Sequence, residues 1–549
     1  MMLSRAADTP AADPGLTPGR RVVEGRSIRW HAERASRAYA EGHWVRDTLA
    51  DALVEAAERT PDRILLVDGA TSLNAAAIYR RATRLARHLA DRMPRGSVVS
   101  FMLPNWHEAA LLYLASTLAG MVANPILPSL RDRELGYILS DADSRMIVIP
   151  GEWRGHDYAA MLGRTIGGLA DPPEVVFVRG AESAARGFED LEADDSHDNI
   201  PLPVLDPDAV RMILYTSGTT GRPKGVLHTH NSLHALTRQI GQHWRVAPGD
   251  VFLVPSPISH IGGSLYAFET PLLLGATAVL MDRWDAQEAL VLAERHACTH
   301  MAGATPFLDQ MVTAAQAADR HLPDLKVFIC GGAAVPSALI RRAADWFDQT
   351  AVTRVYGSTE VPVTTVGAPH RDQIDMAADT DGRPGIADIR VEPDGEVLAR
   401  GPQMLAGYLH AEDENDAFDA DGFYRTGDLG RLRPDGALVI TGRAKDLIIR
   451  KGENIAPKEI EDALVEHAAV HEAAVVGLPD DVTGERAWAV LVTDGTALEL
   501  ADVTAFLREA GVAAFKLPEA VAVWPELPKN DAGKILKEQI RSRLMREET

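Results

Sequence analysis

The fold of this chain is decided by residues 215–226, which read YTSGTTGRPKGV. A strand-like apolar run, VRMILY at residues 210–215, leads into this loop. Glycine lets a backbone approach a phosphate closely, while hydroxyls and a lysine supply hydrogen-bond donors and a positive charge. A strand followed by such a loop predicts a phosphate-binding turn, with these candidate residues: Thr216, Ser217, Gly218, Thr219, Thr220, Gly221 and Lys224.

Two other interpretations of the loop fit less well. A Walker P-loop ends in Gly-Lys followed by Ser or Thr, whereas here Pro223 precedes Lys224 and Gly225 follows it. A flexible linker rich in Ser, Thr and Gly is the structural alternative. Linkers rarely carry a Pro-Lys-Gly run directly before an apolar turn, so we favour the phosphate loop.

The rest of the chain has the composition of a globular protein. Its 549 residues are 46% hydrophobic and 24% charged, and this length predicts two or more domains. The net charge of −22 repels polyphosphate backbones, so we expect no nucleic-acid partner. The two cysteines, Cys298 and Cys330, form neither a disulfide framework nor a zinc site, and they are typical of a cytoplasmic protein.

We expect no membrane association. The first residues, MMLSRAADTPAADPG, contain no apolar signal core. The most apolar stretch, Ala109–Ala123, is too short to span a bilayer and predicts a buried helix. Residues 1–25 are rich in Ala, Pro and Arg without periodicity, and are predicted to be disordered.

Strand-like runs alternate with helical patterns up to about residue 440, which predicts an α/β fold with helix-covered parallel sheet. The predicted strands are Val98–Leu103, Met146–Pro150, Val251–Val254, Ala276–Leu280 and Lys326–Cys330. The predicted helices are Trp44–Ala56, Glu108–Leu118, Asp285–Arg295 and Ser337–Gln349.

The pattern of apolar and polar residues changes near residue 440. A strand-like run at Gly436–Thr441 is followed by a polar segment, and we place a domain boundary at residues 443–446. About 100 residues remain, enough for a small domain. They predict strands at Ala473–Val476 and Ala487–Val492, and helices at Pro457–His467, Leu500–Ala510 and from near Gly533.

The loop at residues 215–226 resembles the phosphate-binding loop of the adenylate-forming superfamily, which includes acyl-CoA synthetases, nonribosomal adenylation domains and beetle luciferases. Other motifs of that superfamily follow in order over roughly residues 45–545. The resemblance implies a large domain of helix-flanked sheets with a β-barrel-like subdomain at 26–442, a hinge at 443–446, and a small mobile α+β domain at 447–549. It also implies ATP/AMP, Mg²⁺ and coenzyme A, a small-molecule carboxylic acid, and a monomer or homodimer.

Three motifs of the large domain receive roles through this resemblance. In SPISHIGG, His260 is implied to lie near the substrate carboxylate, although a histidine bound by backbone groups is the alternative. In VFICGGAAVP, the turn is implied to flank the adenine and the acyl pocket through Gly332, Ala333 and Ala334. In YGSTE, Tyr356 is implied to stack on adenine, Thr359 to touch the α-phosphate, and Glu360 to bind Mg²⁺ together with Thr216; Gly357 and Ser358 complete that turn.

Further roles fall on the segments that end the large domain and form the small one. Asp428, in YRTGDLG, is implied to hold both ribose hydroxyls with Arg443 beside it, and Lys445 occupies the hinge position. The coenzyme A tunnel is implied to be lined by Arg450, Lys451 and Gly452, where many relatives have glycine in place of Lys451. Lys534 corresponds to the adenylation lysine, in a turn where Asn530 and Ala532 replace the usual Thr or Ser.

The chemistry requires positive charge at the reacting centre, because a carboxylate attacks the α-phosphate of a polyanion. Mg²⁺, Lys534 and Lys224 supply that charge, with His260 and Glu360 as the other catalytic candidates. We therefore expect an AMP-forming acid–thiol ligase, which makes an acyl-adenylate from ATP with release of pyrophosphate and then an acyl-CoA with release of AMP.

The substrate is predicted to be a bulky hydrophobic acid, alicyclic, aromatic or polycyclic. Residues 98–150 most resemble ligases for alicyclic, aromatic or medium-chain acids, and the implied pocket has small walls at Ser259, Gly262, Gly263, Gly332, Ala333 and Gly357. Four alternatives stay open: loading of a carrier protein, luciferase-like oxidation of the adenylate, a nucleotide-binding regulator without turnover, and an enzyme that performs only one half-reaction.

Overall fold

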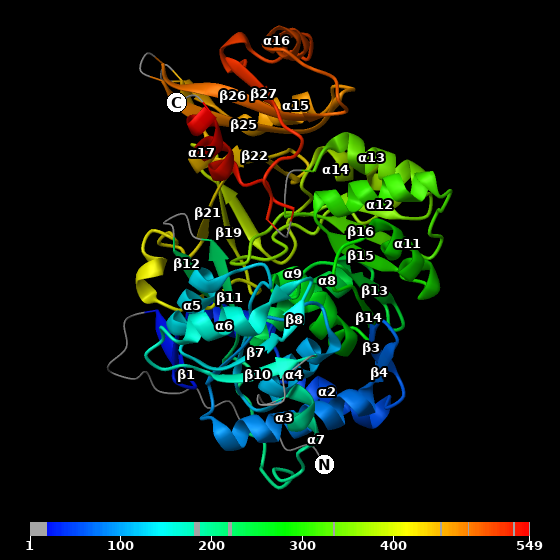
Figure 1. Ribbon diagram of the computed structural model, residues 1–549, viewed down its shortest axis with the longest axis vertical. Helices are drawn as coiled ribbons and strands as arrows, with labels where there is room; N and C mark the ends of the chain where they lie inside the picture. The colour runs from blue at the N-terminus through cyan, green and yellow to red at the C-terminus, as the bar shows by residue number, and fades with distance from the viewer. Residues whose placement is uncertain are drawn as a thin grey trace.

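The computed structural model describes residues 19–179, 187–217, 222–332, 335–450, 453–480, 483–530 and 533–547. A large N-terminal part carries two seven-stranded sheets, and a smaller C-terminal part with its own sheet lies at one end of it (Figure 1). A curled antiparallel sheet of half-barrel form lies between them. The α/β class, with a small α+β domain at the C-terminus, is confirmed.

The first sheet is parallel except at the edge that carries the phosphate-loop hairpin. Strand β11 runs parallel to β6, whereas β12 turns back beside it and pairs with β20. The strand order is β10 (Glu174–Val178), β7 (Ser144–Pro150), β5 (Val98–Phe101), β6 (Val122–Pro125), β11 (Val210–Ser217), β12 (Pro223–Thr229) and β20 (Gly407–Tyr408).

The second sheet is parallel except for its terminal hairpin β3–β4. Its strand order is β17 (Ala351–Arg354), β16 (Val327–Cys330), β15 (His300–Gly303), β13 (Val251–Val254), β14 (Thr277–Leu280), β3 (Ile64–Asp68) and β4 (Thr71–Asn74). Parallel strands end at the same edge, so the loops that follow β13, β15, β16 and β17 meet there.

Helices form three layers around these two sheets. Strand alternation explains the layering, because Val148 of β7 faces the shared core while Ile147 and Ile149 face the outer layer. The middle layer holds α2 (Leu49–Arg59), α3 (Ala75–Arg92), α4 (His107–Leu118), α8 (His230–His243), α9 (Ile261–Ser264), the π-helix η1 (Leu265–Glu269) and α10 (Thr270–Leu273). The outer layers hold α5 (Asp132–Asp141) and α6 (Tyr158–Ile166) on one side, and α11 (Ala286–Arg295), α12 (Thr305–Ala317), α13 (Ser337–Trp346) and α14 (Ile374–Asp379) on the other.

The predicted buried helix is α4, in which every residue from Glu108 to Leu118 is buried. It ends at Leu118, as predicted for the helix Glu108–Leu118; the apolar stretch continues to Ala123, but Gly120 has a positive φ of 67° and turns the chain into β6. The helix predicted at Trp44–Ala56 begins later, at Leu49. Asp51 accepts a hydrogen bond from the Thr48 backbone N–H at 2.7 Å, and this capping interaction fixes the first turn.

The half-barrel sheet and the C-terminal part follow in chain order. The half-barrel consists of β18 (Asp388–Val391), β19 (Glu396–Arg400), β21 (Tyr424–Leu432) and β22 (Leu438–Arg443). The C-terminal part contains β23 (Ile448–Arg450), β24 (Glu453–Ile455), α15 (Pro457–Leu464), β25 (Val470–Asp480), β26 (Gly484–Thr493), α16 (Leu500–Glu509), β27 (Ala520–Val523) and α17 (Lys537–Glu547). Only the 3₁₀ turn η4 (Ala444–Asp446) separates β22 from β23; that residues 443–446 act as a hinge stays a prediction.

The N-terminal segment differs from the sequence-based expectation. Disorder was expected through residue 25, but β1 (Arg20–Val23) pairs with β2 (Arg26–Arg29) in an antiparallel hairpin followed by α1 (Ala32–Ala40). Val23 and Ile28 are buried in a core cluster with residues of the first sheet, and this packing orders the hairpin. Residues 1–18 lie outside the described residues.

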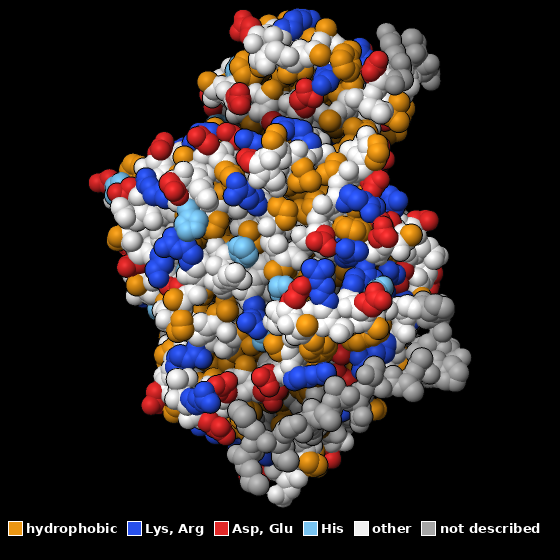
Figure 2. Space-filling view, turned by 180° about the vertical axis from the view of Figure 1, so that it is seen from behind, with side chains coloured by type: hydrophobic (Ala, Val, Ile, Leu, Met, Phe, Trp, Pro, Cys, Tyr) orange, Lys and Arg blue, Asp and Glu red, His pale blue; other side chains and the backbone are white. Residues whose placement is uncertain are grey.

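The surface charges, the apolar character of the helices and the two cysteines are those of an ordinary globular protein. Figure 2 shows acidic and basic side chains interspersed over one face, with apolar side chains scattered among them. Among the helices that the described residues form, none has both the length and the apolar character needed to cross a bilayer. Cys298 and Cys330 are free and buried, and burial raises the pKa of each thiol to about 12.

A buried ion pair links the phosphate-loop strand to the π-helix. Arg211 of β11 lies 2.9 Å from the Glu269 carboxylate, and their side chains are 2% and 0% exposed. The Tyr113 hydroxyl of α4 donates to the same carboxylate at 2.6 Å. The pair therefore holds the strand that leads into the loop against the middle helical layer.

We predict that Arg211→Met lowers the free energy of unfolding by about 3–5 kcal/mol, because it leaves the Glu269 carboxylate buried without its cation. The double variant Arg211→Met/Glu269→Met should lose less than this single variant. Urea denaturation measures both, with Arg59→Met on the exposed face of α2 as a control that changes stability by less than about 0.5 kcal/mol. Additive losses in the double variant would contradict this account of the pair.

Candidate active site

The phosphate-loop hairpin places its lysine beside an acidic and an aromatic residue. Strands β11 and β12 pair so that Thr216 lies opposite Lys224 and Ser217 opposite Pro223. The Lys224 ammonium lies 3.6 Å from the Asp413 carboxylate and 5.3 Å from the centre of the Tyr408 ring. These contacts direct the lysine toward the segment that carries Tyr408.

Tyr408 connects this lysine to Glu360. Its hydroxyl donates to Glu360 Oε1 at 3.1 Å and lies 3.2 Å from the Tyr424 hydroxyl. Glu360 is buried, and its backbone carbonyl accepts from the Leu405 N–H at 2.7 Å. Two tyrosine hydroxyls and a buried carboxylate therefore meet at the end of the loop that follows β17.

A second buried carboxylate, Asp428, lies on the same strand as Tyr424. The Tyr356 hydroxyl donates to Asp428 Oδ2 at 2.7 Å, and Arg443 Nε lies 2.9 Å from Oδ1. Register sets the second contact, because Asp428 of β21 pairs directly with Arg443 of β22. Burial, followed by the negative charge of Asp428, raises the pKa of Tyr356 well above its usual value, so its hydroxyl stays protonated and donates.

Lys534 reaches this cluster from the C-terminal part. Its turn is closed by Asn530, whose backbone N–H donates to the Lys534 carbonyl at 3.0 Å and whose side-chain oxygen accepts from the Lys534 N–H at 2.9 Å. Gly533 adopts a φ of +74°, and a Cβ there would lie 2.9 Å from Pro306 in α12. A glycine at residue 533 thus lets the turn dock closely on the large domain. Asn530, which the sequence marked as a departure, holds the lysine backbone in place.

Four charged groups act on the Lys534 ammonium. Burial is the largest influence, and together with the positive charges of Arg443 and Lys445 it lowers the pKa of Lys534 to about 8. The carboxylates of Asp428 and Asp446 act in the opposite direction. The lysine from one part of the chain therefore shares an electrostatic environment with Asp428 and Arg443 from the other.

The His260 motif forms a tight turn after β13. His260 precedes α9, and its N–H donates to the Pro257 carbonyl at 2.9 Å. At Gly263 a Cβ would lie 2.1 Å from the same carbonyl oxygen, so only glycine fits. Sequence reasoning missed Asn105, which binds this turn from the other sheet by donating to the Val254 and Ser256 carbonyls at 3.0 and 2.9 Å. An asparagine beside Pro104 in the loop after β5 was the only signal available.

Glycines form the wall at the ends of the neighbouring strands. Gly331 donates to the Gly303 carbonyl at 3.1 Å, and Gly332 has a positive φ of 84°. A Cβ at Gly357 would lie 2.6 Å from the Val363 nitrogen, which fixes this position as glycine. At Gly262 a Cβ would contact the Tyr266 ring at 3.4 Å. Backbone and small side chains, including the buried Ser259, thus line this edge of the second sheet.

The structure brings together most of the described residues that the sequence singled out. Tyr356, Asp428, Arg443 and Lys534 form one cluster, and Tyr424 joins it to Glu360, because both Glu360 and Asp428 influence the Tyr424 pKa. Arg450 is an exception: it contacts Glu519 at 2.5 Å and the Phe515 carbonyl at 3.0 Å, both within the C-terminal part.

For several of the predicted site residues, the structure shows no hydrogen bond to the Asp428 cluster or does not describe the residue. Ser358 Oγ accepts from the Val361 N–H at 3.2 Å within the loop. The Thr359 carbonyl lies 2.8 Å from Nε2 of His228 in β12, which ties the loop to the first sheet. Some predicted residues lie outside the described residues: Gly218, Thr219, Thr220, Gly221, Ala333, Ala334, Lys451, Gly452 and the departure Ala532. The Ser217 side chain is also outside them.

Two family models match this chain. The AMP-binding enzyme family matches residues 53–409, and the AMP-binding enzyme C-terminal domain matches residues 459–534. A medium-chain fatty-acid–CoA ligase of Escherichia coli (strain K12) is 33% identical over 548 residues, covering 95% of this chain and 94% of the relative.

Two further similarities cover nearly the same length. The 3-[(3aS,4S,7aS)-7a-methyl-1,5-dioxo-octahydro-1H-inden-4-yl]propanoyl:CoA ligase of Rhodococcus jostii (strain RHA1) is 32% identical over 510 residues, covering 90% of this chain and 98% of the relative. The crystal structure of ATP-bound MatB from Rhodopseudomonas palustris superposes with a TM-score of 0.79 at 28% identity, covering 90% of this chain and 98% of that one.

We predict that two substitutions move the Lys534 pKa in opposite directions from its value of about 8. Asp428→Asn removes an attractive negative charge and should lower it, whereas Lys445→Met removes a repelling positive charge and should raise it. Nitrogen NMR of the lysine side chains during a pH titration measures the change, with Lys534→Arg identifying the resonance. Shifts of the same sign in both variants would contradict the arrangement.

Proposed function

We propose, from the premise that the chain belongs to the AMP-binding enzyme family, that it activates a bulky hydrophobic carboxylic acid and transfers the acyl group to coenzyme A. The chain is an AMP-forming acid–thiol ligase of that family. The proposed residue roles rest on the position of Lys534. This lysine comes from the C-terminal domain, yet it lies in the electrostatic environment of Asp428 and Arg443.

The nucleotide would lie between the hairpin loop and the Asp428 cluster. In this proposal Asp428 accepts from the two ribose hydroxyls, since one carboxylate has acceptor sites for two donors. Tyr356 and Arg443 already contact that carboxylate and would position it. The triphosphate would extend toward Lys224 at the start of β12, with Gly332 leaving space beside the adenine.

Glu360 fits a magnesium ion on chemical grounds. It is a buried carboxylate that accepts from the neutral Tyr408 hydroxyl at 3.1 Å, and among the described residues no Lys, Arg or His lies within 4.0 Å of it. A buried carboxylate without a cation is costly, and Mg²⁺ is typically held by one or two carboxylates with phosphate oxygens. Glu360 would hold the ion with Thr216 nearby, and the bound ion would supply Lewis-acid stabilisation of the phosphate oxygens.

In the first half-reaction, a carboxylate oxygen of the acid attacks the α-phosphorus and the bond to pyrophosphate breaks. The phosphate oxygens gain negative charge in the transition state. Lys534 and Lys224 would oppose that charge, in a site where burial makes each positive charge more effective than in water. His260, at the N-terminal end of α9, would lie beside the carboxylate of the acid.

In the second half-reaction, the thiol of coenzyme A attacks the carbonyl carbon and AMP leaves. We propose that the C-terminal domain rotates about Lys445 between the two steps, because Lys534 occupies the site during the first. Such a rotation would withdraw Lys534 and present residues 450–452. Arg450 is at present held by Glu519 and Phe515, which fits a state in which the tunnel residues have not yet turned inward.

Coenzyme A would approach along a cavity that the sequence did not predict. This cavity of about 500 Å³ borders the His260 turn at Pro255 and Pro257, and it is lined by Trp284 and Phe307 together with three arginines: Arg131, Arg154 and Arg283. Apolar walls suit the pantetheine arm, and guanidinium groups suit phosphates, which they bind in bidentate fashion.

The substrate class rests on the wall beside His260. Gly332 has open space where a Cβ would lie, and Ser259 contributes little side-chain volume. Small walls leave room for a large acyl group. Relatives of similar length are named for a medium-chain fatty acid and for a bicyclic propanoic acid, which supports a bulky hydrophobic acid here as well.

We predict that Lys534→Ala lowers adenylate formation by about 10²–10³-fold, because it removes one well-placed charge from the transition state. Thioester formation from supplied acyl-adenylate should be spared. ATP–pyrophosphate exchange measures the first reaction, and acyl-CoA release the second. Lys529→Ala is the matched control, since Lys529 lies in the same segment but pairs with Glu472 at 2.5 Å. Equal loss of both half-reactions would contradict the role of Lys534.

The substrate proposal predicts that alicyclic and aromatic acids react faster than acetate. Hydroxamate-trapped activity across a library of carboxylic acids, with and without coenzyme A, tests it directly. Acyl-CoA should accumulate when coenzyme A is present. Acetate as the best substrate would refute the substrate class. Adenylate formation without any thioester would instead show that a carrier protein is the acceptor, or that only one half-reaction takes place.

A further inference from the structure

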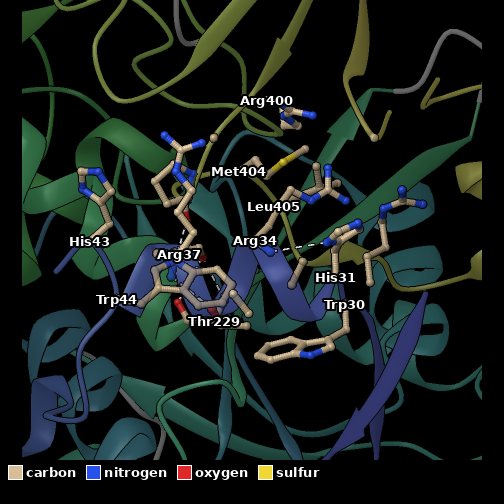
Figure 3. Close-up of a pocket in the computed structure, with 18 of the residues that line it drawn as sticks. Trp30, His31, Arg34, Arg37, His43, Trp44, Thr229, Arg400, Met404 and Leu405 are labelled. Carbon is tan, nitrogen blue, oxygen red and sulfur yellow. Dashed lines mark hydrogen bonds between the residues drawn. The ribbon is translucent and has the colours of Figure 1, made fainter. Parts of the chain in front are cut away.

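A second cavity lies away from the catalytic cluster, where the N-terminal hairpin and α1 pack against the large domain. It encloses about 270 Å³, and its wall combines α1, the segment from Arg400 to Ala406, and Thr229 at the end of β12. Figure 3 shows the Trp30 and Trp44 rings at the bottom of the view and Arg400 and Met404 at the top. Its lining includes none of the residues proposed above for the nucleotide, the acid or the metal.

The aromatic side of the cavity comes from two tryptophans that the hairpin and the segment before α2 bring together. Their ring centres lie 5.8 Å apart at an angle of 35°. Trp44 is fixed by a hydrogen bond from its indole N–H to the Pro402 carbonyl at 2.9 Å. Both side chains are half-buried, so part of each ring remains available to a flat ligand.

The opposite side of the cavity is positively charged, in a protein whose net charge is −22. Three guanidinium groups line it, from Arg29, Arg34 and Arg400. Burial, followed by the charges of Arg400 and Arg29, lowers the Arg34 pKa. The carboxylates of Asp419 and Asp421 act in the opposite direction. Like charges placed this close repel one another, and an anion bound between them would relieve that repulsion.

Arg34 is the member of this group without an ionic partner. Arg29 pairs with Glu414 at 3.1 Å and Arg400 with Asp388 at 2.9 Å. Arg34 donates to the Asp421 backbone carbonyl at 2.9 Å, and among the described residues no carboxylate lies within 4.0 Å of it. The group is also held in position, since a Cβ at Gly422 would collide with its guanidinium.

Of the three acidic residues among the described residues of the lining, Asp388 neutralises Arg400, with which it pairs at 2.9 Å, and the other two are engaged by other groups. Glu41 pairs with Arg37 at 2.7 Å on the exposed side of α1. Asp208 accepts from Arg21, Tyr39 and Asn231 behind the wall. Each acidic side chain of the described lining therefore has a partner, Arg34 keeps a charge that none of these carboxylates pairs with, and a cation is a poor occupant of the cavity.

We propose that this pocket binds a small organic anion that has an aromatic body and one anionic head group, a carboxylate or a sulfonate. The aromatic body lies against Trp30 and Trp44, and the head group contacts Arg34 and Arg400. An Arg–anion contact of this kind is charge-assisted and directional, and an aromatic ligand gains further stabilisation from ring contacts. The cavity volume of about 270 Å³ fits a bicyclic aromatic ligand.

Fluorine NMR of fluorotryptophan-labelled protein tests this pocket with naphthalenesulfonate as the probe. The chain has nine tryptophans, and Trp30→Phe and Trp44→Phe identify the two resonances of the pocket. The probe should shift these two resonances in a saturable manner. A sulfonate is used because it is not a carboxylic acid substrate, so the result does not depend on whether the proposed ligase reaction occurs.

Variants that remove one positive charge test whether the affinity for the probe depends on the arginines of the pocket. Arg34→Gln should weaken binding by about tenfold, the loss expected for one charge-assisted contact, and Arg400→Gln should act in the same direction. Arg59→Gln removes the same charge from the exposed face of the neighbouring α2 and should leave the affinity unchanged. Uncharged naphthalenesulfonamide should bind about tenfold more weakly than the sulfonate.

Several results would overturn the proposal. They are the absence of saturable shifts at Trp30 and Trp44, shifts confined to other tryptophans, and equal affinity for the charged and the neutral probe. Unchanged affinity in both Arg34→Gln and Arg400→Gln would overturn it as well. Thermal unfolding of each variant shows whether a loss of binding follows from loss of structure, and two independent arginine variants keep the test decisive if one of them unfolds.

Discussion

The site depends on one buried carboxylate, Asp428, and on the positive charges that surround it. A carboxylate removed from water is stable only when donors and cations replace its hydration; Tyr356 does this from the loop after β17 and Arg443 from strand β22. Lys534 enters the same environment from the C-terminal domain. The requirement to stabilise this charge therefore brings residues from both parts of the chain to one place, which is the proposed nucleotide site.

Topology explains why these loops meet. Strands β13, β15, β16 and β17 end at the same edge of the second sheet, and the His260 turn, the glycine wall and the Tyr356–Glu360 loop follow them. The phosphate-loop hairpin approaches from the first sheet, held by the buried Arg211–Glu269 pair. The catalytic candidates of the large domain thus lie in strands or in the turns that follow them, and the C-terminal domain adds Lys534 through a glycine turn that fits against α12.

Local sequence patterns and motifs predicted many of the secondary-structure elements and the candidate site residues. Strand and helix patterns located β13 and α16 almost to the residue, and the ordered motifs identified Asp428, Glu360 and Lys534. Tertiary contacts were not predictable in the same way. The N-terminal hairpin is ordered by packing of Val23 and Ile28 on a distant sheet, and no local pattern signals that contact. Asn105 and Tyr408 were missed for the same reason, since each acts on residues far away in sequence.

The central claim is that Lys224, Glu360, Asp428 and Lys534 surround one nucleotide. A crystal structure of the protein with a non-hydrolysable ATP analogue and Mg²⁺ tests it most directly. The account predicts ribose hydroxyls on Asp428, the metal ion on Glu360, and the α-phosphate within reach of Lys534. A nucleotide bound elsewhere, or a ribose that contacts Asp428 while the triphosphate points away from both Glu360 and Lys534, would contradict it.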